Sequence, residues 1–230
     1  MLFRSRDSTI GFGAVGVTIS ITSYKKMKFG SLDTLGYGQL ELPPQTLDTN
    51  ALWIAPPPDA LRRLRESGRV PLEGMLGIAN AAVGVMPLRV MCDANDIGAV
   101  VDSTQLGTPA LFIYDKYPGG LGLAQRAFDL VESLFTAAHA LISECECADG
   151  CPSCVGSARK TYTYYDAEGA AHERLPDKEA SLVVLHEILG LEPYQMCDGS
   201  TTSAEEEPIE QMPTELESRV RRQLQRLKGV

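Results

Sequence analysis

The 230-residue sequence is poor in aromatic residues (7%), has a single tryptophan, and contains no run of about 18 apolar residues. The missing apolar run argues against a membrane span, and the polar first residues argue against a secretory signal. We therefore expect a cytoplasmic protein, in which thiols stay reduced and clustered cysteines indicate metal binding more than disulfides. A hydrophobic content of 44% is enough for one sizeable core.

The sequence also lacks an excess of positive charge, since its net charge is −9. Residues 1–91 carry 10 Lys and Arg against 7 Asp and Glu, whereas residues 92–197 carry 6 against 16. The tail, 198–230, carries 5 against 7. This balance argues against a protein that coats nucleic acid by bulk charge, but leaves room for a local basic patch.

Several catalytic motifs are missing. There is no Gly-Lys pair and hence no phosphate-binding loop of the G-x-x-x-x-G-K type, no H-E-x-x-H helix and no G-x-S-x-G elbow. The G-x-G-x-x-G pattern at residues 11–16 precedes a β-branched run rather than a helix, so it does not predict a dinucleotide site. The glycines at 119, 120 and 122 do precede a helix. They favour a plain tight turn, with a phosphate at the helix N-terminus as the alternative.

Hydrophobic periodicity predicts an α+β fold, built round a mixed β-sheet with packed helices and a four-cysteine zinc knuckle. We expect one domain over residues 1–197, a flexible acidic linker over 198–213, and an amphipathic helix over 214–229. The expected strands cover residues 15–24, 51–54, 88–92 and 110–114. The expected helices cover residues 59–70, 76–85 and 123–143, and a further helix starts near Asp177 and stops at Gly190.

Four cysteines lie within ten residues, and they carry the strongest chemical signal: Cys145, Cys147, Cys151 and Cys154. Zinc prefers four ligands in a tetrahedron, and the two-residue spacer of the second pair is typical of a zinc knuckle. In an extended backbone, residues two apart point to the same side, so the first pair can share the same ion. Disulfides, a reactive thiol and an iron–sulfur cluster are the alternatives. With four sulfur ligands the ion would be structural, because no position stays open for catalysis.

Other candidate residues have weaker signals. Cys92 and the three histidines, His139, His172 and His186, are expected to be ordinary core or surface residues. Asp93, Asp96, Asp102 and Asp115 gather near strand ends and could hold magnesium, although aspartates often cap turns. The densest basic patch is Lys25, Lys26 and Lys28, which could contact DNA phosphates or form a solvated hairpin end.

Several blocks of sequence resemble one known family. They are Tyr24-Lys25-Lys26, the run 87–93 leading to Asp96-Ile97-Gly98, the segment 113–124 with its Tyr-Pro-Gly-Gly, and the four-cysteine segment 145–154. In this order they resemble the MrfA-type zinc-binding domain, the C-terminal module of superfamily 2 DEAD/DEAH-box DNA helicases. The resemblance covers roughly residues 9–190.

This resemblance implies that the four cysteines are ligands of one structural zinc ion. It also implies a link to ATP-driven DNA unwinding in repair or antiphage defence. The motor domains of the family have no counterpart in this sequence. We therefore expect an accessory domain without motor activity, whose partners are helicase motor domains from the same gene or a separate subunit. Two alternatives stay open: a protein-interaction module of a defence complex, and a magnesium-dependent nuclease-like enzyme that uses Asp93, Asp96 and Asp115.

Overall fold

The computed structural model describes most of the chain up to residue 196. The expected linker (198–213), the expected C-terminal helix (214–229), Cys197 and the side chain of His172 lie outside the described residues. The described ranges are 2–5, 8–21, 23–29, 34–103, 105–156, 162–165, 171–174 and 176–196.

A five-stranded sheet forms the centre of the domain, in the order β1-β2-β5-β7-β6. Each neighbouring pair in it is antiparallel. The alternation of buried and part-exposed residues in β7 shows why this segment forms a strand, since one face must cover the core. The strands are β1 (Leu2–Ser5), β2 (Ser8–Ile19), β5 (Gln45–Ala55), β6 (Ile97–Asp102) and β7 (Ala110–Asp115).

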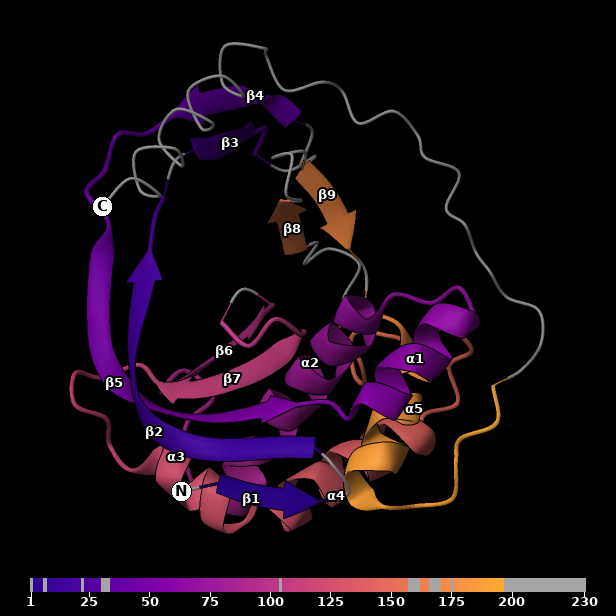
Figure 1. The fold of residues 1–230 in the computed structure, drawn as a ribbon. Coiled ribbons are helices and arrows are strands. Elements are labelled where there is room, and N and C mark those ends of the chain that lie inside the picture. Colours follow the sequence, from indigo (N-terminus) through magenta and orange to yellow (C-terminus); the bar gives the residue numbers. More distant parts are fainter. Residues whose placement is uncertain are drawn as a thin grey trace.

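In the described part of the chain, five helices accompany the sheet and confirm the α+β class (Figure 1). They are α1 (Pro58–Glu66), α2 (Pro71–Val90), α3 (Leu123–Asp129), α4 (Val131–Ser143) and α5 (Lys178–Leu189). Helix α2 is central, because it contacts α4 and α5 as well as β6 and β7. Each large side chain buried in this core contributes roughly 1.5–3 kcal/mol to stability. The largest include Leu52, Ile54, Met75, Ile78, Met86, Leu111, Ile113, Leu134 and Phe135.

Among the described residues, α2 is the one helix that is long and apolar enough to cross a membrane, by length and composition alone. Within its most apolar window, 56% of the residues are buried inside the domain. A core helix surrounded by other helices and a sheet satisfies the same criterion. The helix therefore carries no argument for a membrane span.

An arm leaves the body of the domain. Strands β2 and β5 stay paired over eleven residues, from Thr9 opposite Ala55 to Ile19 opposite Gln45. However, β5 pairs with β7 only over residues 51–54, so no other described strand pairs with the outer part of the ribbon. Figure 1 shows this ribbon arching away from the sheet towards a hairpin of β3 (Ser23–Met27) and β4 (Thr34–Gln39). We call the described residues from 16 to 48 the arm.

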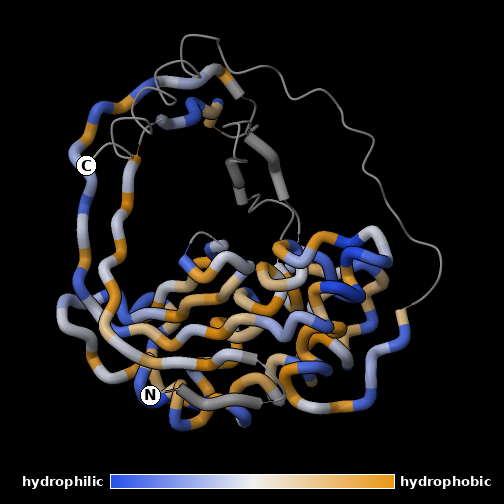
Figure 2. The backbone as a smooth tube through the Cα atoms, in the orientation of Figure 1, coloured by the Kyte–Doolittle hydropathy of each residue, from blue (hydrophilic) through white to orange (hydrophobic). Residues whose placement is uncertain are grey.

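Hydropathy distinguishes the arm from the body. Figure 2 shows apolar segments concentrated in the body, whereas the arm mixes polar and apolar residues along its length. The outer residues of β5, from Gln45 to Asp48, are mostly exposed, and its inner residues from Ala51 to Ala55 mostly buried. The arm thus has no core of its own. A separate hairpin of β8 (Tyr162–Tyr165) and β9 (Ala171–Arg174) completes the strands of the described residues.

Several expected elements differ from the structure. The strand expected over 88–92 is wrong, because α2 continues through Pro87 to Val90 and ends at Met91 in the left-handed conformation (φ 61°). Burial of Met86 and Val90 holds this last turn in place despite the hydrogen bond that Pro87 cannot donate.

Other boundaries also move. The helix expected over 123–143 is two helices, α3 and α4, separated at Leu130, whose φ of −108° and ψ of 19° leave the helical region. The strand expected over 15–24 ends at Ile19, and the short strand at 51–54 is the inner end of β5. The expected start and stop of α5 are confirmed, since Asp177 caps its N-terminus and Gly190 its C-terminus.

Candidate metal centre

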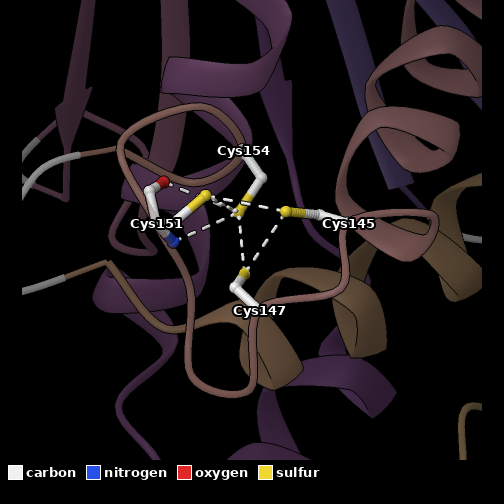
Figure 3. A group of neighbouring side chains, drawn as sticks. All are labelled: Cys145, Cys147, Cys151 and Cys154. Carbon is white, nitrogen blue, oxygen red and sulfur yellow. Dashed lines mark hydrogen bonds between the residues drawn. The ribbon is translucent and has the colours of Figure 1, made fainter.

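The four cysteines gather at one point after the end of α4. Their sulfur atoms all lie within 4.8 Å of one another, from Cys145, Cys147, Cys151 and Cys154 (Figure 3). The shortest separations are 3.4 Å between the first two, 3.5 Å between Cys147 and Cys154, and 3.6 Å from Cys151 to both Cys145 and Cys154. Four sulfurs at ~2.3 Å from a tetrahedral zinc stand about 3.8 Å apart. The thiols are therefore spaced as a zinc ion requires.

The backbone of the loop explains this convergence. Gly150 adopts φ of +115°, which side chains rarely tolerate, and it turns the chain into the second pair. The N–H groups of Cys154 and Gly156 both donate to the carbonyl of Cys151, closing a tight turn. The N–H of Cys151 also donates to the Cys154 sulfur over 3.3 Å, which favours a thiolate there.

The surroundings shift the pKa values of two of the thiols in opposite directions. A hydrogen bond from the backbone of Ser153, followed by contacts with Cys145 and Cys154, lowers the pKa of Cys151 to about 6. Burial raises the pKa of Cys154 to about 12, consistent with its exposed fraction of 2%. A zinc ion would supply the positive charge that a buried thiolate at Cys154 lacks.

A buried lysine lies beside the cluster. Lys178, the first residue of α5, is 8% exposed, and its Nζ donates to the carbonyls of Cys145 and Cys147, each over 2.6 Å. The same Nζ lies 3.7 Å from the Cys147 sulfur. Four thiolates around one divalent ion would carry a formal charge of −2, which this ammonium group would partly offset. Sequence reasoning missed Lys178, because 31 residues separate it from Cys147.

Asp115 has a structural role that excludes it from metal binding. It is fully buried at the end of β7, and one carboxylate oxygen accepts hydrogen bonds from the N–H groups of Leu121, Gly122 and Leu123. The other oxygen accepts from Ala124 over 2.8 Å. The carboxylate therefore satisfies the first turn of α3. It also occupies the place where a phosphate could have bound.

Of the other expected magnesium ligands, Asp93 and Asp96 are neighbours, since the N–H of Asp93 donates to the Asp96 carboxylate over 3.3 Å, but no third ligand converges with them among the described residues. Asp93 accepts from the N–H of Asn95, and Asp96 accepts from the hydroxyl of Tyr117 over 3.0 Å, which raises the pKa of that tyrosine. Asp102 lies at the opposite end of β6 from Asp96. Among the described residues, the four cysteines are the one group of three or more potential ligands that converges. The structure gives the nuclease alternative no metal site.

Two histidines expected to be ordinary residues form a pair. The Nε2 atoms of His139 on α4 and His186 on α5 lie 3.0 Å apart, and Nδ1 of His186 donates to the carbonyl of Glu192. Burial and the neighbouring ring lower the pKa of His139. This pair links two helices, and no sequence motif predicted it. Cys92 is half-buried, and burial with the nearby Asp96 raises its thiol pKa, as expected for an inert cysteine.

The expected basic patch lies on the arm, at the distal hairpin. Lys25 and Lys26 belong to β3, Lys28 follows it, and all three are exposed. None of the ion pairs between described residues involves them. The glycine pattern at 11–16 lies within β2, so the run after it is a strand, as expected from its β-branched residues.

Comparison with known proteins gives three results. Residues 78–155, from within α2 to the end of the cysteine loop, match the family model of the MrfA Zn-binding domain. The uncharacterized ATP-dependent helicase YprA of Bacillus subtilis (strain 168) is 37% identical over 157 residues, covering 67% of this chain and 20% of YprA. The ATP-dependent helicase HRQ1 of Saccharomyces cerevisiae is 27% identical over 201 residues, covering 81% of this chain and 18% of HRQ1.

Among solved structures, the crystal structure of the DUF1998 helicase MrfA bound to DNA is similar, with a TM-score of 0.56 and 29% sequence identity. The alignment covers 81% of this chain and 23% of that chain. This chain thus spans about a fifth of the length of each of these three helicases.

The fold and the four-cysteine centre define an α+β domain that holds one structural zinc ion. Both cysteine pairs lie inside the segment that matches the family model. The chain carries an MrfA-type zinc-binding domain, of the kind found in ATP-dependent helicases. The resemblance noted in the sequence is thereby confirmed.

Proposed function

We propose that this chain is the zinc-stabilised accessory domain of an ATP-dependent DNA helicase and has no motor activity of its own. The observation that carries the proposal is the convergence of Cys145, Cys147, Cys151 and Cys154 within the matched segment. We propose these four residues as the zinc ligands. The ion supplies a rigid cross-link, because four sulfur ligands leave no open position for catalysis.

The chain's own residues explain how such a domain would support a motor. The zinc loop fixes the end of α4, and α4 packs against α2, which in turn packs on β6 and β7. The strands of the arm continue from the same sheet, so the arm projects from a rigid base. The motor would be supplied by the same gene or by a separate subunit, in DNA repair or in antiphage defence.

The isolated chain is expected neither to hydrolyse ATP nor to unwind DNA. Phosphoryl transfer needs a phosphate-binding loop, a magnesium carboxylate and a charge-stabilising arginine held together, and the sequence has no Gly-Lys pair for such a loop. ATPase and unwinding rates should therefore stay at background for the chain alone and rise only when a helicase motor is added. ATP hydrolysis or unwinding by the isolated chain that persists through several chromatography steps would contradict the proposal. Failure of any motor subunit to bind the chain would also count against it.

We further propose that Lys25, Lys26 and Lys28 contact DNA phosphates. Replacing all three with alanine should weaken DNA binding. It should also make the slope of log K against log salt concentration shallower, by the amount that corresponds to the loss of up to about three phosphate contacts. Titrations by fluorescence anisotropy at several salt concentrations would measure both. A matched control is Arg62→Ala on α1, which removes one exposed charge from the body of the domain. An unchanged salt slope would leave the lysines as solvated surface.

A further inference from the structure

The arm concentrates exposed apolar surface. Eight of the fifteen exposed large hydrophobic side chains among the described residues lie between residues 19 and 42. Their exposed fractions range from 43% for Tyr24 to 104% for Phe29. Scattered exposed apolar residues are ordinary, but a concentration on one projecting element marks a surface that binds something.

The register of the hairpin builds a flat aromatic site on one face. Tyr24 pairs with Gly38, and Lys26 pairs with Gly36, so both side chains lie on the same face, opposite glycines. The ring of Tyr24 lies over the backbone at Gly38, where any Cβ would meet ring atoms at 2.4 Å. One side of the ring is thus supported by backbone, and 43% of the residue stays open to solvent. We call Tyr24, Lys26 and the two glycines the Tyr24 platform.

Positive charge accompanies the platform. The Nζ of Lys26 lies 5.7 Å from the centroid of the Tyr24 ring, and the Nζ of Lys25 lies 5.9 Å from that of Tyr37 on the other face. Residues 23–39 contain three lysines and one acidic residue, Asp33, in a chain whose net charge is −9. The occupant should therefore combine negative charge with flat rings.

We propose that the Tyr24 platform binds single-stranded nucleic acid, with a base stacked on Tyr24 and the flanking phosphates held by Lys26 and its neighbours. The proposal deepens the DNA contact proposed above and rests on it. A supported aromatic ring beside lysines is the arrangement that proteins use for unpaired bases, because every base offers a face for stacking. In a duplex these faces are covered by neighbouring base pairs, so the platform selects single strands. An acidic protein surface would match the positive charge, but it would offer no flat ring to stack on the exposed ring of Tyr24.

Binding of the full, zinc-loaded chain to three probes tests the proposal. The probes are a fluorescent oligothymidylate of about 16 nucleotides, an abasic oligomer of the same length, and a duplex of that length. Tyr24→Leu should weaken binding to oligothymidylate roughly fivefold or more, because it removes one stacked base. Binding to the abasic oligomer and to the duplex should change less than twofold. Tyr24→Phe keeps the ring and should retain binding, while Tyr37→Leu alters the opposite face and serves as the matched control.

Each alternative has its own signature. If Tyr24→Leu leaves binding to oligothymidylate unchanged while the triple lysine variant weakens it, the platform is overturned and the proposed phosphate contact stands. If neither variant changes binding to any probe, the DNA contact itself fails. If Tyr24→Leu abolishes binding of a helicase motor subunit but not of the oligomer, the arm is a protein-docking surface and the platform is overturned. Zinc content and melting temperature should equal those of the wild type for every variant, because the arm shares no core with the body.

Discussion

Replacing Cys151 with serine is expected to release the zinc and to lower the free energy of unfolding by about 3 kcal/mol or more. The loop between α4 and Val155 has few apolar side chains of its own, so the metal is its main cross-link. For a domain of this size, the loss corresponds to a fall of roughly 6–12 °C in melting temperature. Metal analysis and calorimetry of the purified variant would measure both.

Cys92→Ser is the matched control, because the same chemical change falls on a half-buried cysteine outside the cluster. It should keep the zinc and lose little stability. Removal of zinc from the wild type with a chelator should reproduce the effect of Cys151→Ser. A metal-free protein that melts at the wild-type temperature would exclude a structural role for the ion.

The second large effect is expected at Asp115. Changing it to alanine should destabilise the domain by about 3–5 kcal/mol, because four backbone N–H groups would lose their charged acceptor in a buried site. Asp115→Asn should recover part of this loss, since an amide oxygen accepts hydrogen bonds but carries no charge. Urea denaturation would give the free energies, with exposed Asp129→Asn as the control. Equal stability of the Ala variant and the wild type would show that the first turn of α3 does not depend on this carboxylate.

Sequence patterns predicted what depends on local chemistry. The four cysteines required only spacing and ligand preference, and the N-cap at Asp177 required only a residue type before an apolar run. Residues 88–92 were misread because their apolar content suits a strand, whereas burial of Met86 and Val90 keeps residues 88–90 helical. Tertiary packing decided that segment, as it commonly decides short apolar runs.

Long-range contacts were beyond reach for a different reason. The pairing of His139 with His186 joins residues 47 positions apart, and Asp115 acts on backbone groups rather than on a recognisable partner side chain. Of the arm, the sequence predicted only a strand over 15–24, and it missed β4 and the outer part of β5. The point where β5 leaves β7 depends on the length of β7 and on no local signal. Alternation of apolar and polar residues identifies a strand. Whether that strand belongs to the body of the domain or to the arm depends on which strands pair with it.

Lys178 has a consequence for how the protein is made. Its neighbours Asp177 and Glu179 form ion pairs with Arg69, before α2, and Ser181 donates to the carbonyl of Gly74. The start of α5 thus joins two distant segments, residues 69–74 and the zinc loop. A ribosome releases the four cysteines first and Lys178 only 24 residues after Cys154. The nascent zinc loop therefore exists for a time without its compensating ammonium group and without the helix that covers it. Closure of the domain therefore follows synthesis of the four cysteines, because it requires the first turn of α5.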